Sequence, residues 1–480
     1  MKKIQSDIRA KSPFFLILLL LALLHPLQAL TLEETVFYTL KTNPDILQKQ
    51  KRLKGLNEDK DIARSGFLPK LDVSSGYGFA QEEITPSYRI SGEAVQRVDT
   101  YALASLNLFN GFGTINEMRA QKHRVTSGDY NLLESQGIIA LKTIEAYIAM
   151  MKQKAILKIS HENVKVHQEI YDKLKEKDAS GFGNASDLGF ASGRLTLAQV
   201  NTVINENNFI QAKVIFESIY GRAVKEESLQ EPIFKYNLPK TLKDAALIAL
   251  DNNPSIKVGN YNKKSARSTY QKSKSVYYPK LDLQIKGSWF NESKGYDFSV
   301  NSSYAMVYLT YNLFNGLSDS STIQKEFYNF EESSQYLESV KRDVTKRLGT
   351  SWIASVKIKR QLELLKKMRS FSKKTMEGYY DEFGIGKRTL IDLINVNSDY
   401  NSARQSYEVA RYDYMLAQFR ALEAMGGIVE YFLSRATALN IKIKKLPQET
   451  ESVYEILEAM DSALYQSTNK NSKTKVKVKK

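Results

Sequence analysis

The apolar positions near the start of this chain follow a helical spacing. After Thr31 they recur every three or four residues, which predicts a helix. Glu34 follows Thr31 by three residues, the pattern of a capping box at which a helix begins. Asn43-Pro44 predicts the start of a second helix, because proline at the first helical position removes no amide that the helix needs.

The spacing of apolar residues changes to two after Pro69 and again after Pro279, which predicts a strand at each place. Return strands are expected near residues 100–108 and 304–313. The segments have about the 9–11 residues of a membrane-crossing strand. Aromatic residues lie near their ends: Tyr77, Phe79, Tyr101, Phe109, Trp289, Phe290, Tyr304, Tyr308, Tyr311 and Phe314. The pattern alone leaves two interpretations open, namely membrane strands with an aromatic belt or two amphipathic hairpins on a soluble domain.

Two very long helices are predicted to follow the strand pairs, over residues 113–177 and about 320–381. At 1.5 Å per residue the first would span about 98 Å. A medium helix returns after each, to about Tyr220 and about Met425. Two rows of side chains have coiled-coil spacing: Leu141, Ile144, Ile148, Met151 and Ala155, and the more polar Leu348, Trp352, Ser355 and Lys359. Helices of this length cannot bury such seams in a compact core, so each hairpin needs the other and further chains.

The chain is internally duplicated. Asn253-Pro254 repeats Asn43-Pro44 at a distance of 210 residues, and the second Pro-Lys-Leu-Asp follows the first by 210 as well. Leu-Phe-Asn-Gly at 313–316 repeats 108–111 at a distance of 205 residues. Several landmarks in the same order at nearly constant spacing indicate a tandem repeat.

The duplication and the termini divide the chain into four parts. The expected boundaries are a signal peptide at 1–29, a first repeat at 30–237 (strand hairpin near 70–109, helical hairpin 113–221), a second repeat at 238–427 (strand hairpin near 280–314, helical hairpin 318–425) and an extension at 428–480. The first part has a basic start, an apolar run of eleven residues and Ala29 at a plausible cleavage point. The last part contains a plausible helix around 452–465 and a basic tail, for which we expect disorder and assign no function.

Composition narrows the classes of protein. The chain contains no cysteine, so disulfides, thiolate metal sites and a lipid anchor on cysteine are excluded. Its net charge of +16 comes from basic residues scattered among acidic ones, and an export signal argues against nucleic acid as a partner. After Ala29 no apolar run reaches the ~20 residues of a membrane helix, so membrane entry would require a β-barrel.

Two stretches resemble catalytic motifs and fail on spacing. Gly386-Lys387 lacks the glycine that a phosphate loop has five residues earlier, where Asp381 stands. His161-Glu162 lacks the second histidine of a zinc protease at residue 165. We therefore expect no enzyme, no metal and no cofactor.

The chain resembles the outer-membrane factor (TolC) family of export ducts from about Thr31 to Gly427. The resemblance rests on the paired Asn-Pro helices, the two Pro-Lys-Leu-Asp and Leu-Phe-Asn-Gly segments, and residues 386–393, with a weaker copy at 181–188. It implies a mainly α fold with four strands per chain, long coiled-coil hairpins, and a homotrimer that closes one β-barrel in the outer membrane above a periplasmic tunnel. The implied partners are a periplasmic adaptor, an inner-membrane transporter of the ABC or RND type, and outer-membrane lipid.

The resemblance also implies two groups of site residues at the far end of the tunnel. An entrance latch falls on Ser186, Asp187, Phe383 and Arg388, where phenylalanine lacks the hydroxyl of the family's tyrosine. Arg388 with Asp187 would keep a charge-assisted pair. A lumen ring falls on Asp392 and Asn395, where the family has two acids, so one carboxylate ring is expected rather than two. The alternative role for Asp392 is a helix cap.

Two functions remain open at this stage. The favoured one is a passive conduit from periplasm to exterior in an efflux or type I secretion system. The alternative is a structural coiled-coil surface protein or adhesin without a pore. The lack of a lipid-anchor cysteine favours the type I secretion subgroup, and the substrate cannot be identified because a duct needs no dedicated pocket.

Overall fold

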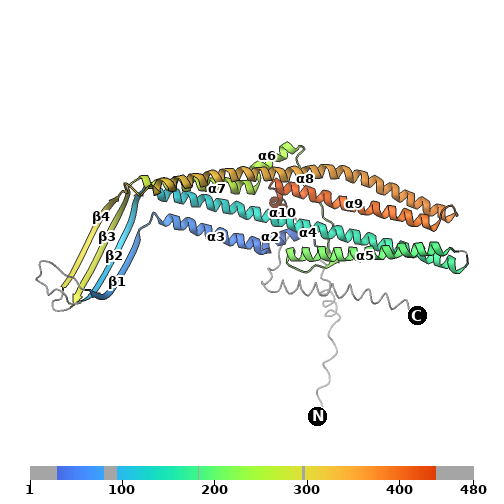
Figure 1. The fold of residues 1–480 in the computed structure, drawn as a ribbon, viewed down its shortest axis with the longest axis horizontal. Coiled ribbons are helices and arrows are strands. Elements are labelled where there is room, and N and C mark those ends of the chain that lie inside the picture. Colours follow the sequence, from blue (N-terminus) through green and yellow to red (C-terminus); the bar gives the residue numbers. More distant parts are fainter. Residues whose placement is uncertain (1–29, 81–94, 182, 294–297, 439–480) are drawn as a thin grey trace, which may run out of the picture.

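The computed structural model describes residues 30–80, 95–181, 183–293 and 298–438. The expected signal peptide, the helix around 452–465 and the basic tail lie outside these residues. Figure 1 shows an elongated molecule with a sheet at one end and helices along the rest of its length. Among the helices of the described part, none combines the length and apolar character needed to cross a membrane.

The short helices begin where the caps were predicted. Helix α2 (Leu32–Thr42) starts at Thr31, whose hydroxyl accepts a bond from the Glu34 amide at 3.1 Å, while the Glu34 carboxylate accepts one from the Thr31 amide at 3.0 Å. The second helix of each repeat starts after an asparagine cap. These helices are α3 (Pro44–Ser65) and α7 (Pro254–Ser273), and α6 (Leu242–Asn252) is the copy of α2.

The four strands form one antiparallel sheet in the order β1-β2-β3-β4. Their bounds are β1 (Lys70–Ala80), β2 (Val95–Asn110), β3 (Lys280–Ser293) and β4 (Phe298–Thr310). A short 3-10 helix, η2 (Lys274–Tyr277), precedes β3. Strands β1 and β4 are the two edges, and each is paired on one side only.

Both return strands differ from their predicted limits. Strand β2 starts five residues earlier than expected, because residues without clear alternation are held by backbone pairing to β1 and β3. Strand β4 also starts earlier, and it ends at Thr310 rather than near 313. The end has a local cause, since the Asn312 side chain accepts a bond from the Phe314 amide at 3.1 Å and turns the backbone.

Four helices build the long part of the molecule. They are α4 (Gly113–Ala179) and α8 (Ser318–Gly384), each of 67 residues, and the returning α5 (Ala185–Tyr220) and α9 (Leu390–Ala424). They contact one another in the order α5-α4-α9-α8, and nearer the sheet the order is α3-α4-α7-α8. The layer therefore has α3 and α5 at one edge and α8 at the other. The seam of α4 is buried as predicted at Ile144, Ile148 and Met151.

The main core forms a belt around the middle of the layer. Helix α10 (Ile428–Ala438) packs on α2 and α4, and an extended segment with the 3-10 helix η1 (Glu226–Ser228) lies beside it. The Tyr147 hydroxyl, inside the belt, donates to the Gln230 carbonyl at 2.6 Å. The largest fully buried side chains are Tyr147, Tyr412, Phe216, Phe419 and Phe432. The belt joins both repeats, because its residues come from α4 and α5 and from α8 to α10.

Candidate functional site at the hairpin turns

The turns of the two long hairpins meet at the end of the molecule that lies far from the sheet (Figure 1). Gly181 and Gly386 adopt positive φ angles of 79° and 76°, which favour glycine, where α4 and α8 end. A small apolar core joins the two turns. Its buried members are Ile170, Leu174, Ala191, Leu390, Leu393 and Ile394. The turns thus form one packed unit within a single chain.

Arg388 is held within its own hairpin. Its Nε donates to the Glu382 carboxylate at 2.7 Å, and its guanidinium lies 3.9 Å from the centre of the Tyr379 ring. The hydrogen bond to Glu382 raises the pKa of Arg388 above its ordinary value. In the described single chain Arg388 makes no ion pair with Asp187, so the latch pair stays a prediction for the assembled protein.

The other latch residues have local roles in this chain. Phe383 packs against the small core of the turns and has no polar group to offer. Ser186 and Asp187 lie in the first turn of α5, where the Ser186 amide donates to the Asn184 side chain at 3.1 Å. The first turn of a helix stabilises a carboxylate, so Asp187 is favourably placed whether or not it meets an arginine.

Asp392 caps helix α9. Its Oδ2 atom accepts bonds from the amide and the hydroxyl of Thr389, both at 2.9 Å. These bonds, the backbone one first, lower the pKa of Asp392 below its ordinary value. The cap also explains why α9 begins at Leu390. Asn395 is exposed one turn further along the same helix face.

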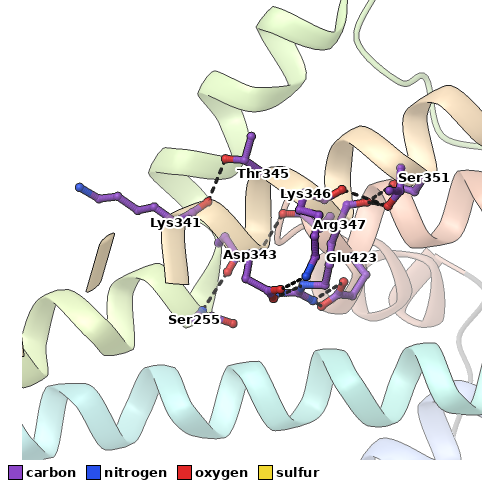
Figure 2. A network of polar contacts seen from close by, with 11 residues as sticks. Ser255, Lys341, Asp343, Thr345, Lys346, Arg347, Ser351 and Glu423 are labelled. Carbon is purple, nitrogen blue, oxygen red and sulfur yellow. Dashed lines mark hydrogen bonds and ion pairs between the residues drawn. The ribbon is translucent and has the colours of Figure 1, made fainter. Parts of the chain in front are cut away.

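Sequence reasoning missed two partners of the turns and one buried ion pair. Glu382 and Tyr379 flank Arg388 across the Gly386 turn, and only the turn geometry brings them together. In the belt, Nη1 of Arg347 on α8 lies 3.1 Å from both carboxylate oxygens of Glu423 on α9, as Figure 2 shows. Burial is the main cause that raises the pKa of Glu423, and Arg347 opposes it.

No catalytic arrangement appears in the described residues. Within them, no group of three or more histidine and acidic side chains is placed to hold a metal ion. His161 lies 3.8 Å from Glu206 as an exposed pair, and His167 lies alone within the helical layer. The polar contacts at the turns are helix caps and one ion pair.

Comparison with known proteins gives consistent matches over most of the chain. The family model described as outer membrane efflux protein matches residues 38–222 and 247–427, one stretch in each repeat. The outer membrane protein TolC of Salmonella enteritidis is 22% identical over 424 residues, covering 86% of this chain and 84% of that protein. The outer membrane efflux protein BepC of Brucella suis is 20% identical and covers 82% and 85%.

A solved structure supports the fold independently. The CmeC outer membrane channel of Campylobacter jejuni superposes with a TM-score of 0.71 at 16% identity, over 89% of each chain. At this identity the likeness concerns the fold alone. It agrees with a mainly helical chain that carries one four-stranded sheet.

Proposed function

Since the chain belongs to the outer membrane efflux protein family, and is an outer-membrane channel with a tunnel that extends into the periplasm, we propose that three copies build one continuous duct. The duct is a passive path to the exterior for substrates that an inner-membrane transporter delivers through a periplasmic adaptor. The family and the relatives named above are channels, which supports a protein without enzymatic activity. The single observation that carries the proposal is the pair of open edges on each chain.

The open edges occur at matching places along the molecule. The sheet ends at β1 and β4, and among the described residues the outer backbone groups of these two strands have no strand as a partner. The helical layer ends at α5 and α8, which expose rows of apolar side chains. The exposed residues are Leu197, Val200, Val203, Ile204 and Ile215 on α5, and Ile353, Val356, Leu364, Met368 and Phe371 on α8. If β4 and α8 of one copy meet β1 and α5 of the next, the backbone groups at the sheet edges gain hydrogen-bond partners. The apolar rows on the helices are then also covered.

The duplication provides a template for this contact inside the chain. The end of β2 meets the start of β3, where Phe109, Phe112 and Tyr278 form an edge-to-face cluster with ring centres 5.3 to 6.4 Å apart. In the second repeat Phe109 and Phe112 correspond to Phe314 and Leu317. In the first repeat Tyr278 corresponds to Leu68. These copies lie on opposite edges and cannot meet within one chain.

The residues that correspond to this aromatic cluster in the other repeat are exposed, as expected if they contact a neighbouring chain. Leu313, Phe314 and Leu317 are 87%, 76% and 70% exposed, and Leu68 at the other edge is 58% exposed. Exposed apolar clusters of this kind mark sites of association. We infer that 313–317 of one copy packs on 65–68 of the next, as 108–112 packs on 275–278 within the chain.

Neither adaptor nor transporter class is readable from the chain. The adaptor and transporter follow from the proposed role, because a duct that begins in the periplasm needs a supply from the inner membrane. The absence of cysteine still favours the secretion-type subgroup over lipid-anchored efflux channels.

The purified protein is expected to run as a trimer in detergent and to give discrete single-channel conductance in planar lipid bilayers. Replacing Phe314 and Leu317 together by glutamate should abolish the trimer, because two charges would enter an apolar contact. Leu433→Glu, an exposed leucine on α10 away from both edges, is the matched control and should leave the trimer intact. A trimer without conductance would favour the structural surface protein, and a conducting monomer would overturn the proposed duct.

Ion preference tests the proposed ring at the turns. Three symmetry-related Asp392 carboxylates at a constriction would attract cations and repel anions. We expect Asp392→Asn to remove the cation preference in bilayer reversal potentials, and Asn395→Asp to increase it. Asparagine can still accept the Thr389 bonds, so thermal stability should change little in the first variant. Unchanged selectivity with lower thermal stability would leave Asp392 a cap only.

A further inference from the structure

One face of helix α6 is exposed, whereas the equivalent face of α2, its copy in the first repeat, is buried. The copies of Leu32, Tyr38 and Leu40 on α2 are Leu242, Ile248 and Leu250 on α6. The α2 residues are 2%, 6% and 3% exposed, and the α6 residues are 37%, 36% and 42% exposed. Leu247 on the same helix is 59% exposed.

The difference in exposure between α2 and α6 is confined to one side of each helix. The face toward the long helix is buried in both copies, by Thr35 and Thr39 in α2 and by Ala245 and Ala249 in α6. What α2 has in addition is α10, which packs along it, and the end of α5, where the ring of Tyr220 lies 5.0 Å from the ring of Tyr38. An ion pair fixes α10 there, since Arg435 Nη2 lies 2.6 Å from a carboxylate oxygen of Glu33. In the described part of the chain no helix takes the corresponding place beside α6.

The sequence after α10 contains a second segment with its apolar pattern. Residues 453–464 match 428–439 at a distance of 25 residues. Four aligned apolar pairs are Ile428 with Val453, Tyr431 with Ile456, Phe432 with Leu457, and Leu439 with Leu464. The buried Ala436 is an exception, because it aligns with Asp461. In α10, Ile428 and Phe432 are each 1% exposed, so this pattern is the one that packs into the belt.

The charges around α6 differ from those around α2 and oppose the net charge of the second segment, although the residue that aligns with Arg435 is the uncharged Met460. The position of Glu33 on α2 is taken by Lys243 on α6. Residues 448–465 contain five acidic residues and neither lysine nor arginine. Helix α6 packs on α8, and the stretch of α8 at residues 341–360 carries seven basic residues and one acidic residue. An acidic helix therefore fits beside α6 where a basic one would not.

The length of the linker after α10 limits how far from α10 the second segment can lie. Thirteen residues, 440–452, connect the end of the α10 pattern with the second segment and can span up to about 43 Å. Figure 1 places α6 and α10 at the same level along the long axis. We propose that residues 453–464 form a helix that covers the apolar face of α6 in the same chain, as α10 covers α2.

Thiol labelling tests the cover, because the chain has no cysteine of its own. In the trimer in detergent, Leu250→Cys should react with a maleimide about tenfold or more slowly in the full chain than in a chain ending at Leu439. Leu457→Asp with Met460→Asp in the full chain should restore fast labelling without truncation. Glu58→Cys, exposed on α3, should react equally fast in all three proteins. Equal rates at Leu250→Cys would overturn the proposal, and slow labelling in every variant would mean that a neighbouring copy covers α6.

Crosslinking tests the register. Met460 aligns with Arg435 and Lys243 with Glu33, so Lys243→Cys with Met460→Cys should be joined within one chain by a short bifunctional thiol reagent. Glu58→Cys with Met460→Cys is the matched control and should not be joined. Products of twice the chain mass from the first pair would show that the segment covers a neighbour, and no product would overturn the register. Conductance should be unchanged by the single cysteines, so failure here is distinct from failure of the duct.

Discussion

Replacing Arg347 by leucine is expected to lower the free energy of unfolding by about 3 kcal/mol at neutral pH. The variant would leave Glu423, whose side chain is 12% exposed, without its cation. Removing one partner of a buried pair is costly because the remaining charge stays desolvated. The estimate is at the lower end of the usual range, since the Arg347 side chain keeps 36% of its surface exposed.

The effect should depend on pH in a defined direction. Burial raises the pKa of Glu423 above 4.5, so its charged form disfavours the folded state. Loss of Arg347 removes an influence that lowers this pKa and therefore raises it further. A carboxyl with a raised folded pKa gains stability as pH falls through that pKa. The destabilisation of Arg347→Leu should thus shrink between pH 7 and pH 5.

Denaturant unfolding at fixed protein concentration, at both pH values, checks this expectation. The double variant Arg347→Leu with Glu423→Leu is the control, and it should lie close to the native protein because no buried charge remains. Asp343, 3.1 Å from Arg347 Nε, loses only an exposed contact in both variants. Equal destabilisation at both pH values would contradict the assigned role of Glu423.

Gly111→Ala is expected to destabilise the folded chain by about 4 kcal/mol or more. Gly111 has a φ of 63°, which strains any L side chain. A methyl group there would lie 2.4 Å from the Ser275 carbonyl oxygen and 2.7 Å from the Tyr278 Cβ atom. Backbone cannot yield as a flexible side chain does, so the contact between β2 and η2 would open. The measurement is thermal unfolding together with the yield of folded protein.

A substitution at Gly316, the counterpart of Gly111 in the second repeat, distinguishes an effect on assembly from an effect on folding. Gly316 has a φ of 58°, but no atom lies within 4 Å of its Cβ position in the single chain. Gly316→Ala should therefore cost about 1–2 kcal/mol through backbone strain alone. If β4 meets β1 of the next copy as proposed, the same methyl would strike Ser65 there and block the trimer. A Gly316→Ala protein that forms trimers as stable as the native ones would contradict this contact.

The repeating elements were predictable because each depends on local signals. Caps at Thr31 and Asn43, prolines before the strands and a change of apolar period fix helices and strands within a few residues. The limits of β2 and β4 were less accurate, since partners distant in the sequence hold the first and a side-chain turn ends the second. Helix α10 depends on packing against α2 and α4 of the first repeat, and the Arg347–Glu423 pair depends on packing between α8 and α9; periodicity reveals neither contact.

The hairpin turns also contain contacts that local sequence signals did not predict. The resemblance aligns Arg388 and Phe383 with a latch. In the single chain Arg388 donates to Glu382, and the partly buried Phe383 packs against a small core. The cap by Asp392 was within reach of the sequence, because Thr389 precedes it by three residues. Whether the latch and the ring form depends on neighbouring copies, and no single chain contains that information.

The pairing of β2 with β3 has a consequence for biogenesis. Their partners, such as Leu106 with Leu283, are separated by α4, α5, α6 and α7 in the chain. Contacts at such separation form late, because a long loop must close before they contribute. Until the second repeat has been exported, the β1–β2 hairpin therefore has an open edge on β2 in addition to the outer edge of β1. During that interval the nascent chain is prone to aggregate in the periplasm, so protection by a holding chaperone would matter most then.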